Sequence, residues 1–245
     1  MVLLLGDKEV NSVLDMHECV NVMEDAFMQV GQGKTWNRPR SRIRMPRGFH
    51  HLMAASVLGS NSFGLKTYTS FRAGIRFLTI LYDSNTGDLQ ALIQGGRCSQ
   101  IRTGAVSAIA TKFMARNNST RVGIIGAGYQ ARAQLEGVCA VRSINNIKVY
   151  DRSLETSQKF SSEMSSWLDE KISIVPTAQD AVDDVDIVIT MTTSREPVLF
   201  GEWLQPGMHV NAAGSNHWIR REVDDDVIRR SDIIVVDSIA DAQVE

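Results

Sequence analysis

The residue types best suited to ligand chemistry form one glycine-rich turn, Gly126-Ala127-Gly128-Tyr129-Gln130-Ala131. A short apolar run over 121–125 precedes the turn, a helical segment follows it, and Asp151 ends the next apolar run. Gly126 allows the chain to leave a strand sharply, Gly128 leaves no side chain between the backbone and a pyrophosphate, and Ala131 permits close packing of the helix. The first N–H groups of that helix attract phosphates. The pattern favours a dinucleotide site over a turn that binds nothing.

Asp151 indicates which dinucleotide is bound. At the tip of the second strand, a carboxylate accepts the hydroxyl groups of the adenosine ribose and repels a 2′-phosphate, which selects NAD(H). Arg152 and Ser153 follow it, and these are residue types that hold the 2′-phosphate of NADP(H). Because the acid occupies the strand tip itself, the sequence favours NAD(H) over NADP(H).

The composition limits the kinds of partner. The 245 residues include 26 basic and 28 acidic side chains, for a net charge of -2, and no basic block suggests nucleic acid or an anionic membrane. The N-terminus lacks the basic region with which a signal peptide begins. No apolar run reaches the length of a membrane span, about 20 residues. Cys19, Cys98 and Cys139 lack the spacing of a zinc site or a disulfide framework. We therefore expect a cytoplasmic protein without a metal whose partners are small molecules.

The elements that position the glycine turn alternate between strand and helix. Strands are predicted at 121–125, 147–150, 172–175, 186–190, 208–212 and 232–237, and helices at 154–168 and 178–182. This alternation is typical of a Rossmann-type doubly wound parallel sheet, whose ligands lie at the carboxyl ends of the strands. Asp151, Met191-Thr192-Thr193 and Ala213-Gly214-Ser215-Asn216 should therefore converge there.

The first half of the chain has a different pattern. Asp15 and Glu18 have the spacing of a helix N-cap and its third residue, and Gly31 ends that helix. A short extended run at 2–5 precedes this helix, further runs follow it at 42–45, 50–57, 64–71, 77–83 and 89–93, and a helix is predicted over 97–116. We expect an N-terminal α+β domain with an antiparallel sheet over 1–115 and the nucleotide domain over 116–245. Because one face of such a sheet is left uncovered, a second copy can pack on the sheet over 41–93 as a homodimer.

Taken together, these modules resemble the ornithine cyclodeaminase and mu-crystallin family from Leu14 to the end. The resemblance is carried by Gly64-Leu65-Lys66, Ile101-Arg102-Thr103-Gly104-Ala105, the glycine turn with Gln130, Thr190-Met191-Thr192-Thr193, Val210-Asn211-Ala212-Ala213-Gly214 and Arg221-Glu222-Val223-Asp224. The family comprises NAD(P)-dependent cyclodeaminases, amino-acid dehydrogenases and cyclic imino-acid reductases, and mu-crystallin, which also serves as a binding and lens protein.

The resemblance implies that Arg40, Lys66 and Arg102 hold a substrate carboxylate. A guanidinium grips a carboxylate with two parallel hydrogen bonds, which leaves Lys66 free for proton transfer near the reacting nitrogen. Arg40 stands in an arginine-rich run that by itself is typical of a solvated edge strand. Lys66 and Arg102 have apolar or small neighbours, where a solvated charge is less expected. The implied nucleotide-binding residues are Thr103, Gly126, Gly128, Tyr129, Gln130, Ala131, Asp151, Arg152, Thr192, Thr193, Ala213 and Gly214.

Two departures from the family pattern bear on the reaction. Asn216 stands where cyclodeaminases have an aspartate, and its amide can orient a substrate but cannot take a proton. Family members also continue for roughly another half-domain that returns to the sheet module, and we expect that segment to be missing here. The prediction is an oxidoreductase of the C–N bond of a small amino or cyclic imino acid. Ornithine cyclodeamination, or a non-catalytic binding role like that of mu-crystallin, is the alternative.

Overall fold

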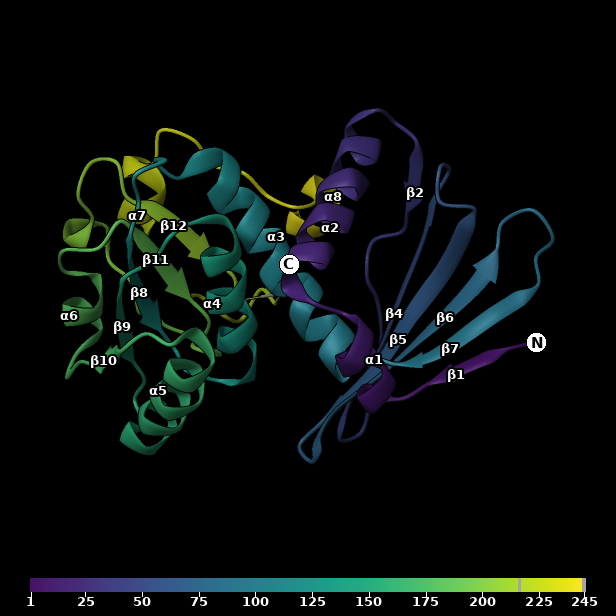
Figure 1. Ribbon diagram of the computed structural model, residues 1–245, viewed down its shortest axis with the longest axis horizontal. Coiled ribbons are helices and arrows are strands. Elements are labelled where there is room, and N and C mark those ends of the chain that lie inside the picture. Colours follow the sequence, from purple (N-terminus) through teal and green to yellow (C-terminus); the bar gives the residue numbers. More distant parts are fainter. Residues whose placement is uncertain (216, 244–245) are drawn as a thin grey trace. The chain divides into compact units, whose positions relative to one another are not determined.

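The computed structural model describes residues 1–215 and 217–243 (Figure 1). The chain divides into two compact units, Met1–Arg102 and Thr103–Glu245, each built around one β-sheet. The division falls within helix α3 (Gly96–Met114). In the described part of the chain, no helix is long and apolar enough to cross a lipid bilayer.

The first unit contains a seven-stranded, largely antiparallel sheet in the order β1-β7-β6-β5-β4-β2, with β3 also paired to β4. Only β1 and β7 pair in parallel among these described strands. The elements are β1 (Leu3–Leu5), α1 (Asp7–Val13), α2 (Met16–Gly31), β2 (Thr35–Asn37), β3 (Ser41–Met45), β4 (Gly48–Val57), β5 (Ser62–Phe71), β6 (Gly74–Asp83) and β7 (Leu89–Gln94). The predicted antiparallel sheet is confirmed, and α1 and β2 are additions to it.

Local side-chain bonds fix the ends of these elements. Asp15 caps α2 by accepting the N–H of Glu18 at 2.9 Å, as its spacing predicts. In the β6–β7 turn, the Asp83 carboxylate accepts the N–H groups of Asn85 and Thr86. These backbone bonds hold the pKa of Asp83 below its usual value.

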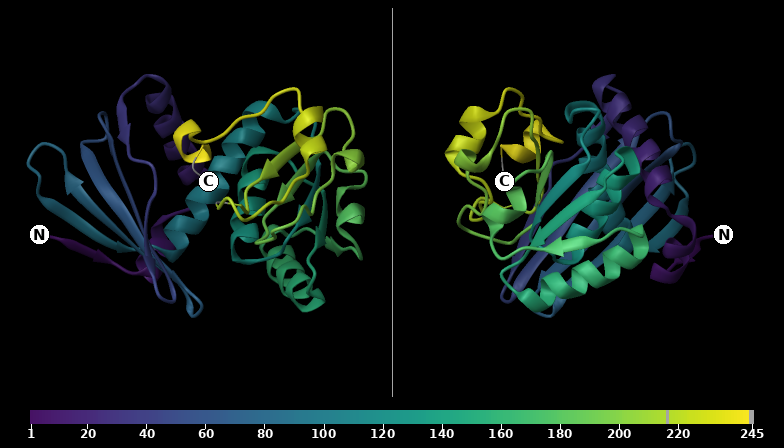
Figure 2. Two further views of the ribbon diagram at one scale, coloured as in Figure 1. Left: turned by 180° about the vertical axis from the view of Figure 1, so that it is seen from behind. Right: turned by 60° about the vertical axis from the view of Figure 1, so that its left-hand side comes forward.

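The two faces of this sheet differ in burial. His51, Tyr68 and Ala91 are buried, and the strand registers place all three on the face that also carries Lys66. Figures 1 and 2 show α1 and α2 on one side of the sheet, whereas no helix of this unit covers the other side. Leu78 lies on the opposite face, because it pairs with Thr67, the neighbour of Lys66 in β5, and it is 37% exposed. One face of the first unit is therefore open and partly apolar.

The second unit is built on a five-stranded parallel sheet in the order β10-β9-β8-β11-β12. After the rest of α3, its elements are β8 (Arg121–Ile125), α4 (Tyr129–Val141), β9 (Asn146–Tyr150), α5 (Leu154–Leu168), β10 (Ile172–Ile174), α6 (Ala178–Val182), β11 (Ile187–Thr190), η1 (Gly201–Trp203), β12 (His209–Ala212), α7 (Asp225–Arg230) and α8 (Ile239–Ala242). The strand order runs outward in both directions from β8, which confirms the predicted doubly wound fold.

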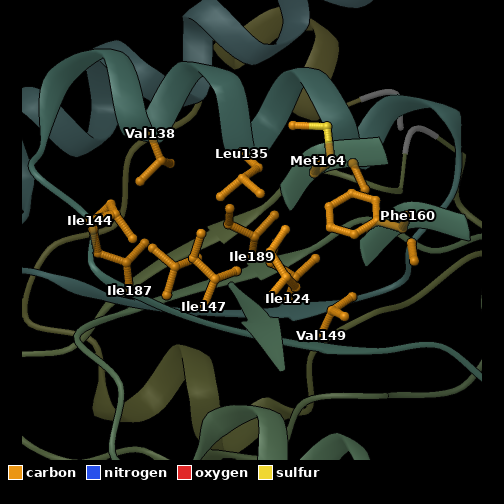
Figure 3. Close-up of a cluster of buried hydrophobic side chains, with 14 of the residues drawn as sticks. Ile124, Leu135, Val138, Ile144, Ile147, Val149, Phe160, Met164, Ile187 and Ile189 are labelled. Carbon is orange, nitrogen blue, oxygen red and sulfur yellow. The ribbon is translucent and has the colours of Figure 1, made fainter. Parts of the chain in front are cut away.

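Apolar cores cover both faces of the parallel sheet. Leu135 of α4 and Phe160 of α5 pack on Ile124 and Ile189 of the sheet in one fully buried cluster (Figure 3). On the other face, Val182 of α6 belongs to a second cluster, which includes strand residues of β8 and β11. Each such buried side chain contributes ~1.5–3 kcal/mol. The carboxyl ends of the strands are thus held by a rigid scaffold.

The strand predicted at 232–237 is wrong. The structure has no strand there, and Ile233, Ile234, Val235 and Val236 are exposed. The residue types favour an extended chain, but a strand also needs a hydrogen-bonding neighbour, and within the described residues β12 ends the sheet on that side. The composition of residues 232–237 indicated a propensity for strand, but it could not indicate whether a neighbouring strand is available for pairing.

Candidate functional site

The glycine turn joins β8 to α4 in the second unit. Gly126 has a φ of +96°, a left-handed conformation that favours glycine, and a Cβ there would lie 2.6 Å from the carbonyl oxygen of Met191. Its N–H donates to the carbonyl of Tyr150 at 2.8 Å. Gly126 is therefore required by the fold itself, which brings the ends of β8, β9 and β11 together.

Gly128 differs from Gly126. It is exposed, its φ is -73°, and a Cβ at this position would meet no protein atom within 4 Å. It stands at the N-cap of α4, where no side chain caps the helix. Open space therefore lies beside this helix N-terminus, and the fold itself does not need a glycine here. Such a place fits a pyrophosphate.

Asp151 follows β9 and is bonded to the turn. One carboxylate oxygen accepts the N–H of Ala127 at 2.9 Å and the other accepts the N–H of Ser153 at 2.9 Å. A carboxylate has about four acceptor sites, so capacity remains for ribose hydroxyls. Asp151 is half-buried, whereas Arg152 is exposed. The acid thus has a structural task in addition to the one predicted for it.

Arg132 also fixes the turn, and nothing in the sequence beyond its charge indicated this role. Its guanidinium donates to the carbonyls of Ala127 at 3.2 Å and Gly128 at 2.9 Å, and to the Glu163 carboxylate at 2.7 Å. The guanidinium carbon lies 5.5 Å from the ring centroid of Phe160. Arg132 therefore ties the turn to α5.

The predicted residues of α3 and α4 lie close to the turn. The carbonyl of Thr103 accepts the side-chain amide of Gln134 at 3.2 Å, which links the start of this unit to α4. Tyr129 is exposed and Ala131 is fully buried. The side-chain oxygen of Gln130 is buried and accepts no hydrogen bond from the described residues. That oxygen can therefore serve a bound ligand.

At the ends of β11 and β12, a buried carboxylate joins the predicted segments. Glu222 accepts the N–H groups of Thr192 at 2.5 Å and Gly214 at 2.6 Å. Thr193 is exposed and Ala213 half-buried. The motif containing Glu222 was noted in the sequence, but its role required the long-range contacts. Asn216 lies outside the described residues.

The first unit holds a cluster of cations on its covered sheet face. Lys66 stands on β5, and its Nζ lies 5.6 Å from the ring centroid of Tyr68 and 6.0 Å from that of Phe77. Burial, followed by the positive charges of Arg102 and Arg40, lowers the pKa of Lys66 from 10.5 to about 7. The structure therefore brings the three predicted cations together, from β5, α3 and the segment before β3.

Aromatic rings form the surroundings of Lys66. His51 stacks on Tyr68 with ring centroids 4.2 Å apart, and Tyr68 contacts Phe77 at 5.0 Å. The imidazole of His51 is also bonded to the Ser70 hydroxyl at 3.0 Å. His51 thus supports the aromatic row from its place in β4, opposite Tyr68. A desolvated ammonium beside two guanidiniums can bind a carboxylate and exchange a proton near neutral pH.

Metal chemistry has no candidate ligands in the described part of the chain, because no three His, Cys, Asp or Glu side chains gather there. The buried His209 is bonded to Asn211 at 3.1 Å, and burial lowers its pKa. The predicted residues thus converge on two candidate sites, one in each unit.

Two solved structures that are similar to this chain hold a nicotinamide dinucleotide. A Δ1-pyrroline-2-carboxylate reductase of Thermococcus litoralis in complex with NADH and L-proline is 35% identical, with a TM-score of 0.88 over 94% of this chain and 74% of that one. An archaeal alanine dehydrogenase dimer with bound NAD is 32% identical, with a TM-score of 0.93 over 99% of this chain and 76% of that one. The ketimine reductase mu-crystallin of Rattus norvegicus is 36% identical over 78% of this chain and 62% of its own length.

The family itself is established by a match over almost the whole chain. The model of the ornithine cyclodeaminase/mu-crystallin family matches residues 2–245, and the chain belongs to that family. The family predicted from the sequence motifs is confirmed. The relatives also belong to the predicted class, since they are oxidoreductases of amino or imino acids.

Proposed function

We propose that the protein is an NAD(P)-dependent oxidoreductase that acts on the C–N bond of a small amino or cyclic imino acid. The observation that carries this proposal is the cluster around Lys66, in which burial and then the positive charges of Arg102 and Arg40 lower the pKa of the lysine to about 7. Two fixed cations suit the carboxylate that amino and imino acids share. A lysine that titrates near pH 7 suits the proton that a C–N redox reaction must move.

Each cation has a proposed role in the reaction. Arg40 and Arg102 orient the substrate carboxylate, and Lys66 donates a proton to the substrate nitrogen during imine reduction or removes it during amine oxidation. A nicotinamide cofactor, held by the residues of the glycine turn, would supply or accept the hydride at the substrate carbon. Burial keeps Lys66 in an environment where its proton is exchanged readily at neutral pH.

The cofactor is proposed to bind at the glycine turn of the second unit. Gly128 leaves space beside the start of α4, and the fold gives no reason of its own for a glycine there. Thr103, Tyr129, Gln130, Thr192, Thr193, Ala213 and Gly214 complete the proposed set, and Asn216, outside the described residues, is proposed from the sequence alone to bind substrate. The charge of Asp151 favours NAD(H) over NADP(H).

Product analysis tests the proposed reaction. Purified protein would be supplied with NADH or NADPH and a panel of cyclic imino acids, and with NAD(P)⁺ and small amino acids for the reverse direction. We expect nucleotide turnover that matches product formation one to one. Formation of ammonia and proline from ornithine without net consumption of nucleotide would instead assign a cyclodeaminase. Nucleotide binding with no turnover of any substrate would assign a binding protein.

The open sheet face of the first unit is proposed to pair with a second copy of the chain. Trp36 and Phe63 lie on this face, each opposite Ser56 in the strand register, and line an open hollow of about 610 Å³. The archaeal alanine dehydrogenase is described as a dimer, and a two-fold pair would cover such a face. The free thiols of Cys19, Cys98 and Cys139 fit a reducing compartment, and we propose a cytoplasmic location.

Light scattering with two matched variants tests the dimer. Leu78 on the open face is 37% exposed and Ile174 in the second unit is 38% exposed. We expect Leu78→Glu to convert the dimer to monomer and Ile174→Glu to leave it intact, because only the first charge would be buried in the interface. A monomeric wild type at micromolar concentration would contradict the proposal.

A further inference from the structure

Glu222 is a buried carboxylate at the carboxyl ends of β11 and β12. Its residue is 3% exposed, and its main chain is anchored because its carbonyl accepts the N–H groups of Val198 at 2.8 Å and Leu199 at 3.0 Å. The carboxylate accepts the N–H groups of Thr192 and Gly214 and, at 3.1 Å, the hydroxyl of the fully buried Thr190. One side chain therefore ties together the ends of two parallel strands.

The chemistry of this arrangement is unusual for a buried charge. Within the described residues, the three donors that meet the Glu222 carboxylate are two backbone N–H groups and one hydroxyl, none of them charged. A buried carboxylate is costly unless hydrogen bonds or cations compensate it. Asp186, the comparable acid before β11, meets the guanidiniums of Arg116 and Arg121. Glu222 instead accepts hydrogen bonds from the backbone and so fixes its conformation at Thr192 and Gly214.

The bonds of Glu222 continue to the glycine turn. A Cβ on Gly214 would lie 2.6 Å from the Glu222 carboxylate, so a glycine is required where the acid grips the backbone. The Thr192 side chain in turn lies where a Cβ on Gly126 would meet it at 2.8 Å. Displacement of Glu222 would therefore alter the backbone of residues 191–192 and 213–214 and the packing beside Gly126.

The strand order indicates which part of a dinucleotide this would affect. Strands β9 and β10 lie on one side of β8, and β11 and β12 lie on the other. A doubly wound sheet binds the two mononucleotide halves on the two sides of this switch point, and the acid after β9 marks the adenosine side. The nicotinamide half accordingly belongs to the side that Glu222 holds.

We propose that Glu222 is a positioning residue that shapes the nicotinamide half of the nucleotide site by fixing the ends of β11 and β12. The inference rests on the proposed nucleotide binding and adds a residue that touches no ligand. It acts through the backbone of Thr192 and Gly214, because its carboxylate is buried beneath them. Loss of the carboxylate should weaken contacts to nicotinamide and leave contacts to the adenosine half unchanged.

Titrations of Glu222→Gln with NADH and with ADP-ribose, which lacks nicotinamide, test the proposal. The glutamine amide must turn its own N–H groups toward at least one backbone N–H, so the strand ends should separate. We expect the Kd for NADH to rise about tenfold and the Kd for ADP-ribose to rise less than about twofold. A general loss of folding would raise both constants together, so their ratio reports positioning.

Two further variants keep the test decisive. Thr190→Val removes only the hydroxyl donor from a fully buried site, and we expect a rise in the NADH Kd in the same direction but smaller, about threefold. Asp186→Asn is the matched control, since it removes a buried carboxylate at the amino ends of β8 and β11. It should lower the melting temperature without changing the ratio of the two Kd values.

Several outcomes would overturn the inference. Equal losses for NADH and ADP-ribose in Glu222→Gln, or no loss for either, would show that Glu222 does not shape the nicotinamide half. A wild type that binds neither compound would overturn both this inference and the proposed function. If the wild type binds NADH and Glu222→Gln shows the expected ratio, but the wild type turns over no amino or imino acid, the proposed reaction alone is contradicted and the role of Glu222 is supported.

Discussion

The candidate sites of the two units are constructed in opposite ways. In the second unit, one stretch of sequence supplies the turn, and backbone groups define it: Gly126 for its conformation and Gly128 for the space it leaves. In the first unit, side-chain charges define the site, and they come from three separate places in the chain, Arg40, Lys66 and Arg102. Backbone shape and side-chain charge can therefore be changed independently, which makes the assignment of binding and chemistry testable.

The largest expected effect comes from Lys66→Met. Removal of a general acid typically costs about 10²–10⁴-fold in rate, and we expect kcat to fall by at least about 100-fold. The Kd for NADH should change little, because the glycine turn belongs to the other unit. Steady-state kinetics and fluorescence titration measure the two quantities. The strand residue Lys148, bonded to a carbonyl in the second unit, provides a control as Lys148→Met.

The outcome that would contradict this role is a modest loss. If Lys66→Met keeps more than about a tenth of the wild-type kcat, it has lost less than ~1.4 kcal/mol of transition-state stabilisation, and Lys66 is not the proton donor. A large rise in the NADH Kd would instead show that Lys66 contributes to nucleotide binding, and that binding and proton transfer are not assigned to different units.

The two glycines of the turn give the next largest effect and a sharper comparison. Gly126→Ala forces a side chain into positive φ and against the Met191 carbonyl, so we expect a loss of ~1–3 kcal/mol of stability as well as of nucleotide binding. Gly128→Ala meets no protein atom, so its melting temperature should be unchanged, yet NADH should bind about tenfold more weakly. Full affinity in folded Gly128→Ala would show that no pyrophosphate passes there.

The pH dependence of the rate follows from the pKa of Lys66. Burial and the two guanidiniums lower it to about 7, so the protonated form needed for imine reduction is lost as pH rises through that value. We expect kcat/KM for reduction to fall above about pH 7, and kcat/KM for amine oxidation to rise over the same range. For stability the sign is fixed too: protonation of the buried amine opposes folding, so the free energy of unfolding should rise from pH 7 towards 10.5. A pH profile of Lys66→Met that keeps the same inflection would assign it to another group.

The contrast between a site formed by one stretch of the chain and a site formed by distant residues also explains what could be predicted from the sequence. The turn and the cap at Asp15 depend on neighbours a few residues apart, and both were predicted from local pattern, as were the strands of both sheets other than β2. Glu222 and Arg132 bind backbone groups outside their own local segment, and the type of a single charged residue does not indicate which backbone group it will bind. The run at 232–237 failed for the same reason, since a strand depends on a partner.

The smallest effect concerns the choice of nucleotide. The Asp151 carboxylate should repel a 2′-phosphate, so its neutralisation should improve binding of NADPH. The carboxylate also accepts the N–H groups of Ala127 and Ser153, and truncation to alanine would disturb the turn as well as the charge. Asp151→Asn retains one carbonyl oxygen as acceptor and removes the charge, which makes it the cleaner variant.

Competition titrations of NADH and NADPH on wild type, Asp151→Asn and Asp151→Ala measure this choice. We expect the wild type to prefer NADH, Asp151→Asn to gain about threefold in NADPH affinity, and Asp151→Ala to gain less because it loses both turn bonds. The exposed Arg152 is the matched control: if Asp151 selects, Arg152→Ala should leave NADH binding unchanged. Tighter binding of NADPH by the wild type would reverse the assignment. No gain in NADPH affinity in either variant would reduce Asp151 to its structural task, the fixing of the Ala127 backbone in the turn.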